Sequence, residues 1–277
     1  MFNRYILLIL ALVCYLSGNA QLSTSKLFFD HLTTEEGLAH NYILSIFQDE
    51  DGFVWLGSDN GLNRYDGQHI DILSSNTKPA LGGNRIRRII QDKSKTLWIL
   101  HENGLDMMDH YTQHIRSFLY GRELKKHILG FGLDDNGDLA AFTESDILLY
   151  NSNSGSFDIK QTAPANFLFS AFVKCGNRYY LGTRRHGIIV YNENWKLLEH
   201  IYPTSIQGGI LEDGLISLLR VDSNGSIWSV MAGLCIQKYD PVTRIVQTYP
   251  LSAHSVINRE VRDIIELNAD YMLVGTF

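Results

Sequence analysis

The sequence predicts an all-β protein built from similar four-stranded sheets. Segments of about 43 residues resemble one another along the 277-residue chain. Each segment consists of short apolar runs separated by Gly, Asp and Asn, which is the pattern of strands joined by tight turns. None keeps apolar residues at spacings of three and four over ten or more positions, as a helical repeat would. A repeat of this length is typical of the four-stranded blade of a β-propeller.

The repeats align around one aromatic position. ILSIFQDEDGFVWLGSDNGLNRYDG at 43–67 aligns without a gap with IRRIIQDKSKTLWILHENGLDMMDH at 86–110, so that Trp55 matches Trp98. The equivalent downstream positions are Ala140, Tyr180, Trp228 and Leu273, at spacings of 43, 42, 40, 48 and 45 residues. We therefore expect five repeats and the start of a sixth, near 43–75, 86–119, 128–160, 168–202, 215–249 and 261–277. The aromatic markers are expected to pack between neighbouring blades.

The first repeat shows how each strand is predicted. Four apolar runs, near 43–47, 53–57, 62–65 and 70–73, alternate with turn residues. Two sets of glycines fit this scheme. Gly52, Gly137 and Gly225 suit a positive φ in the turns, whereas Gly57, Gly182 and Gly275 lie inside strands, where a neighbour is expected to approach closely.

The first twenty residues have the pattern of a secretory signal peptide. Arg4 precedes an apolar run from Tyr5 to Leu16, and small residues follow as far as Ala20. This predicts a signal peptide at 1–20, a propeller domain at 21–277 and a periplasmic location. The apolar run is shorter than the roughly twenty residues that cross a bilayer, so a retained membrane anchor is the weaker alternative, and a lipoprotein signal at Cys14 is weaker still.

The composition excludes several classes of protein. With 45% apolar residues the chain is not a disordered tail, and a net charge of −6 does not fit a general nucleic-acid binder. Beyond the leader only Cys175 and Cys235 remain, too few for a disulfide scaffold, although a bridge between these two is an alternative.

The unit DEDGFVWLGSDNGLNRYDG at 49–67, preceded by FFDHLTTEEGLAHNYI at 28–43, resembles the two-component regulator propeller repeat and its N-terminal lead-in. The resemblance extends over 26–277, with departures at Ala140, Asp146 and Lys174–Cys175. It implies the periplasmic sensor of a hybrid two-component sensor histidine kinase and response regulator. Such proteins are anchored in the inner membrane, signal by phosphorelay, and in many cases control polysaccharide utilisation.

The output half of such a regulator is not recognisable in this sequence. It has no histidine-kinase phosphoacceptor box, nucleotide-binding glycine boxes, receiver aspartate cluster or DNA-reading helix-turn-helix. We therefore expect a sensor without enzymatic activity. Because complete propellers usually have four to eight full blades and the sixth repeat is only begun, we also expect the chain to be the amino-terminal portion of a longer protein or a truncated product. Downstream propeller, sandwich and kinase domains, or a homodimer, are compatible with the resemblance. Residues 26–31 are expected to form the outer strand of a last blade.

A ligand site is predicted where the loops entering each first strand meet the turns between second and third strands. These segments carry amides, guanidinium groups and imidazoles, which suit an oligosaccharide, and arginines would bind acidic sugars. The candidate ligand-binding residues are Asn41, Asn84, Arg85, Asn103, Arg184, Arg185, His186 and Arg259. A solvated turn is the alternative for 184–186.

No catalytic site, cofactor or metal site is predicted. His110 and His114 fall in a turn and at a strand edge, where their spacing does not converge on a metal, and Asp49 to Asp51 match a turn better than a calcium loop. Two other functions remain as alternatives. One is a scaffold for protein partners, and the other is a propeller lyase or hydrolase.

Overall fold

The computed structural model describes residues 31–134, 136–202, 214–232, 234–251, 261–268 and 271–276. From Thr33 onward these residues belong to one compact unit. The predicted signal peptide, most of the predicted closing strand at 26–31, and Arg259 lie outside the described residues. Within the described ranges no helix is long and apolar enough to cross a membrane.

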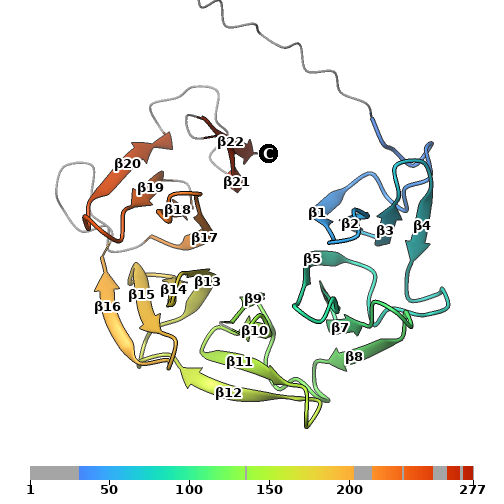
Figure 1. Ribbon diagram of the computed structural model, residues 1–277, viewed down its shortest axis with the longest axis horizontal. Helices are drawn as coiled ribbons and strands as arrows, with labels where there is room; N and C mark the ends of the chain where they lie inside the picture. Colours follow the sequence, from blue (N-terminus) through green and yellow to red (C-terminus); the bar gives the residue numbers. More distant parts are fainter. Residues whose placement is uncertain are drawn as a thin grey trace, which may run out of the picture. The chain divides into compact units, whose positions relative to one another are not determined.

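The regular elements of the described chain are antiparallel strands. They form five four-stranded sheets and one two-stranded sheet, and in each sheet consecutive strands are hydrogen-bonded neighbours. The sheets follow one another around a common centre, with the first strand of each sheet innermost (Figure 1). The predicted all-β propeller, with five complete repeats and the start of a sixth, is confirmed.

The strand bounds are as follows. Blade 1 contains β1 (Ile43–Gln48), β2 (Val54–Ser58), β3 (Gly61–Tyr65) and β4 (Ile70–Leu73), and blade 2 contains β5 (Ile86–Gln91), β6 (Leu97–His101), β7 (Gly104–Met108) and β8 (Ile115–Leu119). Blade 3 contains β9 (Gly130–Leu133), β10 (Leu139–Phe142), β11 (Asp146–Asn151) and β12 (Ser156–Thr162), and blade 4 contains β13 (Phe169–Cys175), β14 (Arg178–Thr183), β15 (Ile188–Asn192) and β16 (Leu197–Ile201). Blade 5 contains β17 (Ile216–Val221), β18 (Ile227–Met231), β19 (Cys235–Tyr239) and β20 (Val246–Pro250), and β21 (Val261–Asn268) with β22 (Tyr271–Thr276) begins the sixth.

The marker aromatics pack between blades as predicted. Trp55, Trp98 and Tyr180 are buried, and Trp55 belongs to an apolar cluster that includes Ile86 of the next blade. Trp228 departs from the prediction because it is only half-buried. It packs beside the two-stranded sheet and stacks on Tyr249, with 5.8 Å between ring centroids.

An aspartate six residues before each of the three marker tryptophans fastens the hairpin between the first and second strands. Trp98 donates its indole N–H to Asp92 Oδ2 over 2.8 Å, while Asp92 Oδ1 accepts the backbone N–H groups of Ser94 and Thr96. The same bonds join Asp49 to Trp55 and Asp222 to Trp228, at 2.7 and 2.9 Å. Each buried carboxylate therefore ties a turn to a blade core, an arrangement that sequence analysis did not identify.

Both predicted sets of glycines have the expected surroundings, with one exception. Gly52, Gly137 and Gly225 adopt φ values of +90°, +74° and +79°. A Cβ on Gly57 would lie 2.3 Å from Ser45 Oγ, and one on Gly182 would lie 2.5 Å from Ile216 Cγ2. At Gly275 the described residues show no close approach, since the nearest atom to an added Cβ would be Asp263 O at 3.8 Å.

Candidate functional site

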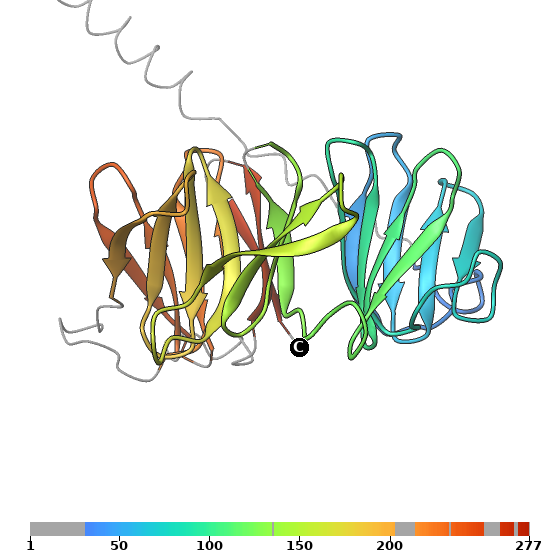
Figure 2. The same cartoon turned by 90° about the horizontal axis from the view of Figure 1, so that it is seen from below.

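The loops that were predicted to bind ligand share one end of the strands. In an antiparallel blade, the loop entering the first strand and the turn between the second and third strands lie at the same end, which we call the entry face. The opposite end carries the turns held by Asp49, Asp92 and Asp222. Figure 2 shows the blades from the side, with strands running between the two ends.

The predicted asparagines on the entry face hold its loops in place. Asn41 Oδ1 accepts the Thr34 N–H over 2.8 Å, and Asn84 Oδ1 accepts the Ser75 N–H over 2.7 Å. Asn103 Nδ2 donates to the Gly82 carbonyl over 3.0 Å. These amides therefore fix the shape of the polar loops, and only their remaining atoms are available to a ligand.

Two predicted arginines form ion pairs with carboxylates of the preceding blade. Arg85 Nε lies 2.8 Å from Asp59 Oδ1, and Arg184 Nη2 lies 2.7 Å from Glu144 Oε1. All four side chains are about half exposed. The ion pairs use one nitrogen of each guanidinium group and locally balance its charge.

The structure brings the predicted residues together in two groups. Asn84 and Arg85 both donate their backbone N–H groups to Glu102, and Asn103 binds the same loop through Gly82. The pKa of the Glu102 carboxyl is lowered, because these backbone bonds outweigh the effect of its partial burial. This first group lies in blade 2, and Asn41 lies in the lead-in to blade 1.

The second group lies in blade 4 and contains Arg184, Arg185 and His186. The His186 ring stacks on Phe167, with 4.2 Å between centroids, and the His200 ring packs at a tilt against Tyr202, at 3.8 Å. Tyr202, whose side chain is 52% exposed, offers an aromatic face of the kind that stacks on sugar rings. The described contacts do not join this group to the one in blade 2.

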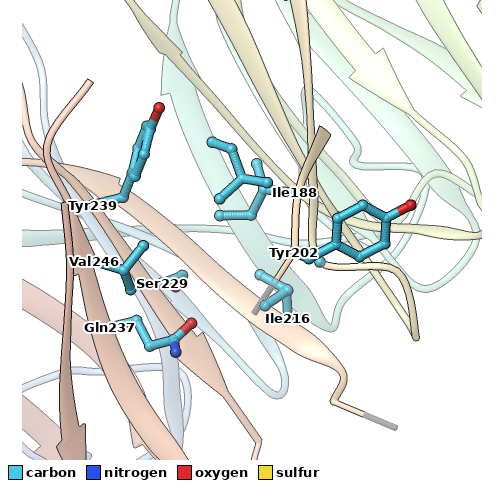
Figure 3. A pocket seen from close by; sticks show the side chains of 9 residues that line it. Ile188, Tyr202, Ile216, Ser229, Gln237, Tyr239 and Val246 are labelled. Carbon is cyan, nitrogen blue, oxygen red and sulfur yellow. The ribbon is translucent and has the colours of Figure 1, made fainter. Parts of the chain in front are cut away.

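A small cavity lies between blades 4 and 5. Tyr202, Ile216, Gln237 and Tyr239 are among its lining residues (Figure 3). Its free space accommodates about one water molecule. It is therefore an imperfection in blade packing and not a ligand site.

Larger cavities lie between the inner strands. The entry-side cavity, of about 560 Å³, is lined at the entry ends of β1, β5 and β21, where it includes Arg87 and Arg262. The far-side cavity, of about 540 Å³, is lined by the far ends of β9 and β13, where it includes Lys174. Arg88 and Arg220 line both cavities, so these two side chains lie where the cavities meet.

The two shared arginines have different surroundings. Arg220 Nη2 pairs with Asp263, at 2.8 Å from Oδ1. Arg88 makes no hydrogen bond or ion pair with the described residues, and its guanidinium group lies over Gly130, where a Cβ would approach Nη1 to 2.7 Å. Burial and the charge of Arg220 lower the pKa of Arg88 to about 10, against the opposing effect of Asp263. Arg88 is therefore still charged at neutral pH.

Sequence analysis missed these arginines, although the alignment contained a signal. Ten residues before the marker position, four repeats have the uncharged residues Ser45, Gly130, Ser170 and Leu218, whereas the second repeat has Arg88 and the sixth has Asp263. A charged side chain at an inner-strand position that is uncharged in four of the six repeats indicates a special role.

Neither a metal site nor a disulfide occurs in the described part of the chain. No group of three or more His, Cys, Asp or Glu side chains there could hold a metal ion. His110 Nε2 lies 2.9 Å from Asp51 Oδ2 and so links two blades. Cys175 and Cys235 are both free thiols, and burial raises the pKa of each.

Comparison with solved structures shows the same fold in bacterial proteins. The chain is similar to an extracellular domain described as part of the hybrid two-component system BT3049 of B. thetaiotaomicron, with 20% identity and a TM-score of 0.69, covering 89% of this chain and 34% of that one. It is also similar to PorZ, a surface component of the type-IX secretion system of Porphyromonas gingivalis, with 15% identity and a TM-score of 0.68, covering 90% of this chain and 40% of that one.

A propeller enzyme shares the fold as well. Virginiamycin B lyase of Staphylococcus aureus is 13% identical, with a TM-score of 0.61, and the match covers 77% of this chain and 71% of the lyase. The comparison with curated proteins gave no match. The chain spans about a third of the length of the BT3049 domain. Residues 37–60 match the family model described as "Two component regulator propeller", so blade 1 carries a two-component regulator propeller repeat, as its sequence predicted.

Proposed function

We propose that this propeller is the extracytoplasmic ligand-sensing module of a two-component signalling system, and that it binds an oligosaccharide. The repeat at 37–60, the fold shared with extracellular domains of such systems and the signal peptide predicted at 1–20 support this role. In this proposal the propeller faces the periplasm and catalyses no reaction. Phosphotransfer is carried out by kinase domains of a longer protein, which is anchored in the inner membrane as hybrid regulators are.

The observation that carries the proposal is the preorganised entry face. Its polar loops are fixed by their own hydrogen bonds, so a ligand need not order them. Arg85 and Arg184 each use one nitrogen for an internal ion pair, which leaves further N–H donors for ligand oxygens. Hydroxyl groups and carboxylates of a sugar chain match such donors.

Calorimetric titration of the purified chain tests this proposal. We would use neutral cello-oligosaccharides, oligogalacturonates and sulfated disaccharides as ligands. Arg85→Ala should weaken binding of the preferred class about tenfold, which is the effect of losing a charge-assisted hydrogen bond. Arg64→Ala is the matched control, since Arg64 forms an ion pair of similar length with Asp71, at 2.7 Å, away from the entry face.

The outcomes separate the proposed sensor from its alternatives. Binding without turnover, weakened by Arg85→Ala and not by Arg64→Ala, supports the sensor. Turnover of a sugar would identify a lyase or hydrolase instead. If no sugar class binds, and a protein is captured with an affinity that depends on Arg85, the propeller is a scaffold.

A further inference from the structure

The central cavities have more positive than negative side chains. The basic residues in their walls are Arg87, Arg88, Lys174, Arg220 and Arg262. The acidic residues are Asp134 and Asp263. The chain as a whole carries a net charge of −6, so the basic lining is a local feature and not a consequence of composition.

Both carboxylates are already engaged within the protein. Asp263 holds Arg220 with both oxygens, at 2.8 and 3.0 Å. Asp134 Oδ1 accepts the N–H groups of Asn136 and Asp138 in the turn of blade 3. Arg88 is therefore left without a carboxylate partner among the described residues, in the region where the two cavities meet.

A β-bulge explains how two adjacent arginines line one cavity. Along a regular strand, consecutive side chains point to opposite faces. The register of β5 against β6 shifts between Ile86 and Arg88, which inserts Arg87 as an extra residue. The same shift occurs in β21 between Val261 and Asp263, where Arg262 is the extra residue. The bulges turn both basic side chains toward the entry-side cavity.

We propose that the entry-side cavity binds the acidic group of the ligand, a carboxylate or sulfate on a sugar, with Arg88 as its principal partner and Arg220 beside it. The inference deepens the sensor function proposed above and rests on it. Arg87 and Arg262, nearer the entry face, attract the anion toward Arg88. A guanidinium group can bind a carboxylate or sulfate through two parallel hydrogen bonds, and this arrangement would satisfy the partly buried charge of Arg88.

The size of the cavity favours a small acidic sugar over a polyanion such as nucleic acid. A space of about 560 Å³ falls within the range of ligand sites for small molecules. Residues of β1, β5, β17 and β21 line this space, whose volume suits a short oligosaccharide.

Replacing Arg88 with Gln tests the site directly. Arg88→Gln should weaken binding of a sulfated disaccharide or oligogalacturonate about tenfold to hundredfold, while binding of neutral cello-oligosaccharides stays the same. Arg122→Gln is the matched control, because Arg122 is exposed and lies outside both cavities. Asp263→Asn should strengthen binding of the acidic ligand, since Arg220 then loses its internal partner.

Thermal unfolding provides an independent readout of folding. Without ligand, Arg88→Gln should unfold at the same temperature as the parent protein or higher, because an unpaired and partly buried charge is removed. Unchanged affinity for acidic ligands in this variant would overturn the inference.

Three results distinguish this inference from the sensor function itself. If the parent protein binds only neutral sugars, the sensor function stands and the acidic-group site does not exist. If inorganic sulfate or monomeric galacturonate binds in a manner that depends on Arg88, but no oligosaccharide binds, the anion site stands and the oligosaccharide sensor does not. If acidic oligosaccharides bind and Arg88→Gln weakens them, both are supported.

Discussion

The bond between Asp92 and Trp98 makes a specific prediction about stability. In Asp92→Asn, the amide oxygen can still accept the N–H groups of Ser94 and Thr96, but an NH₂ group faces the indole N–H. Two donors then meet in a buried site. A lost hydrogen bond to a charged group costs about 1.5 to 3 kcal/mol, which for a domain of this size lowers Tm by about 3 to 12 °C.

A double-mutant cycle isolates this bond. Trp98→Phe keeps an aromatic ring against Phe118 and Tyr150 but removes the indole donor. Once the donor is absent, Asp92→Asn should cost little, so the two substitutions should be coupled by about 1.5 to 3 kcal/mol. Urea unfolding followed by far-UV circular dichroism measures all four proteins. Additive effects, within about 0.5 kcal/mol, would refute a bond between these groups.

Blade 3 supplies a natural control for the same turn. Asp134 accepts the N–H groups of Asn136 and Asp138, as Asp92 does in its own turn, but the marker position is Ala140 and offers no indole. Asp134→Asn should therefore destabilise the protein much less than Asp92→Asn. Equal losses of stability would show that the carboxylate matters only to the turn.

Two further stability predictions follow from contacts and charge. Gly57→Ala should lower the free energy of unfolding by about 1 to 3 kcal/mol, because its Cβ would meet Ser45 and the next blade. Gly275→Ala should leave the free energy of unfolding unchanged, since its Cβ would meet no described atom closer than 3.8 Å. Urea unfolding of the two variants tests this difference. Burial acts to raise the pKa of Asp222, but bonds from Trp228 and Lys238 outweigh it and lower that pKa below 3.8. The ionised Asp222 therefore stabilises the fold above about pH 4, and this contribution is lost as the pH falls through its lowered pKa. Below about pH 4, the Tm of the parent protein should fall more steeply with pH than the Tm of Asp222→Asn.

The strands and blades were predictable because their signals are local. Apolar runs, turn residues and the spacing of Trp55 and Trp98 all lie within one repeat, and each agrees with the others. Even the departures of repeat 3 leave the fold intact. Ala140 is buried among Phe172 and Tyr179 of blade 4, so aromatic rings from the next repeat fill the space where a tryptophan is missing.

The candidate site was less predictable because it depends on contacts between repeats. Arg85 and Arg184 could be assigned to the entry face from strand order, but their ion pairs with Asp59 and Glu144 come from neighbouring blades. The position of Arg88 depends on a bulge, and a one-residue shift in register reverses the face of every side chain. A single sequence does not show where such a shift occurs.

The two ends of the blades have different physical roles, and this separates stability from recognition. At the far end, the carboxylates of Asp49, Asp92 and Asp222 each tie a tight turn to a core, so substitutions there should change stability and leave the loops unaltered. At the entry end, first strands begin with a register shift and receive longer, polar loops. These features weaken sheet regularity but place Arg87 and Arg88 in the entry-side cavity. Recognition is therefore expected at the end where the repeats differ, and the similar turns of the other end provide the rigid support that it needs.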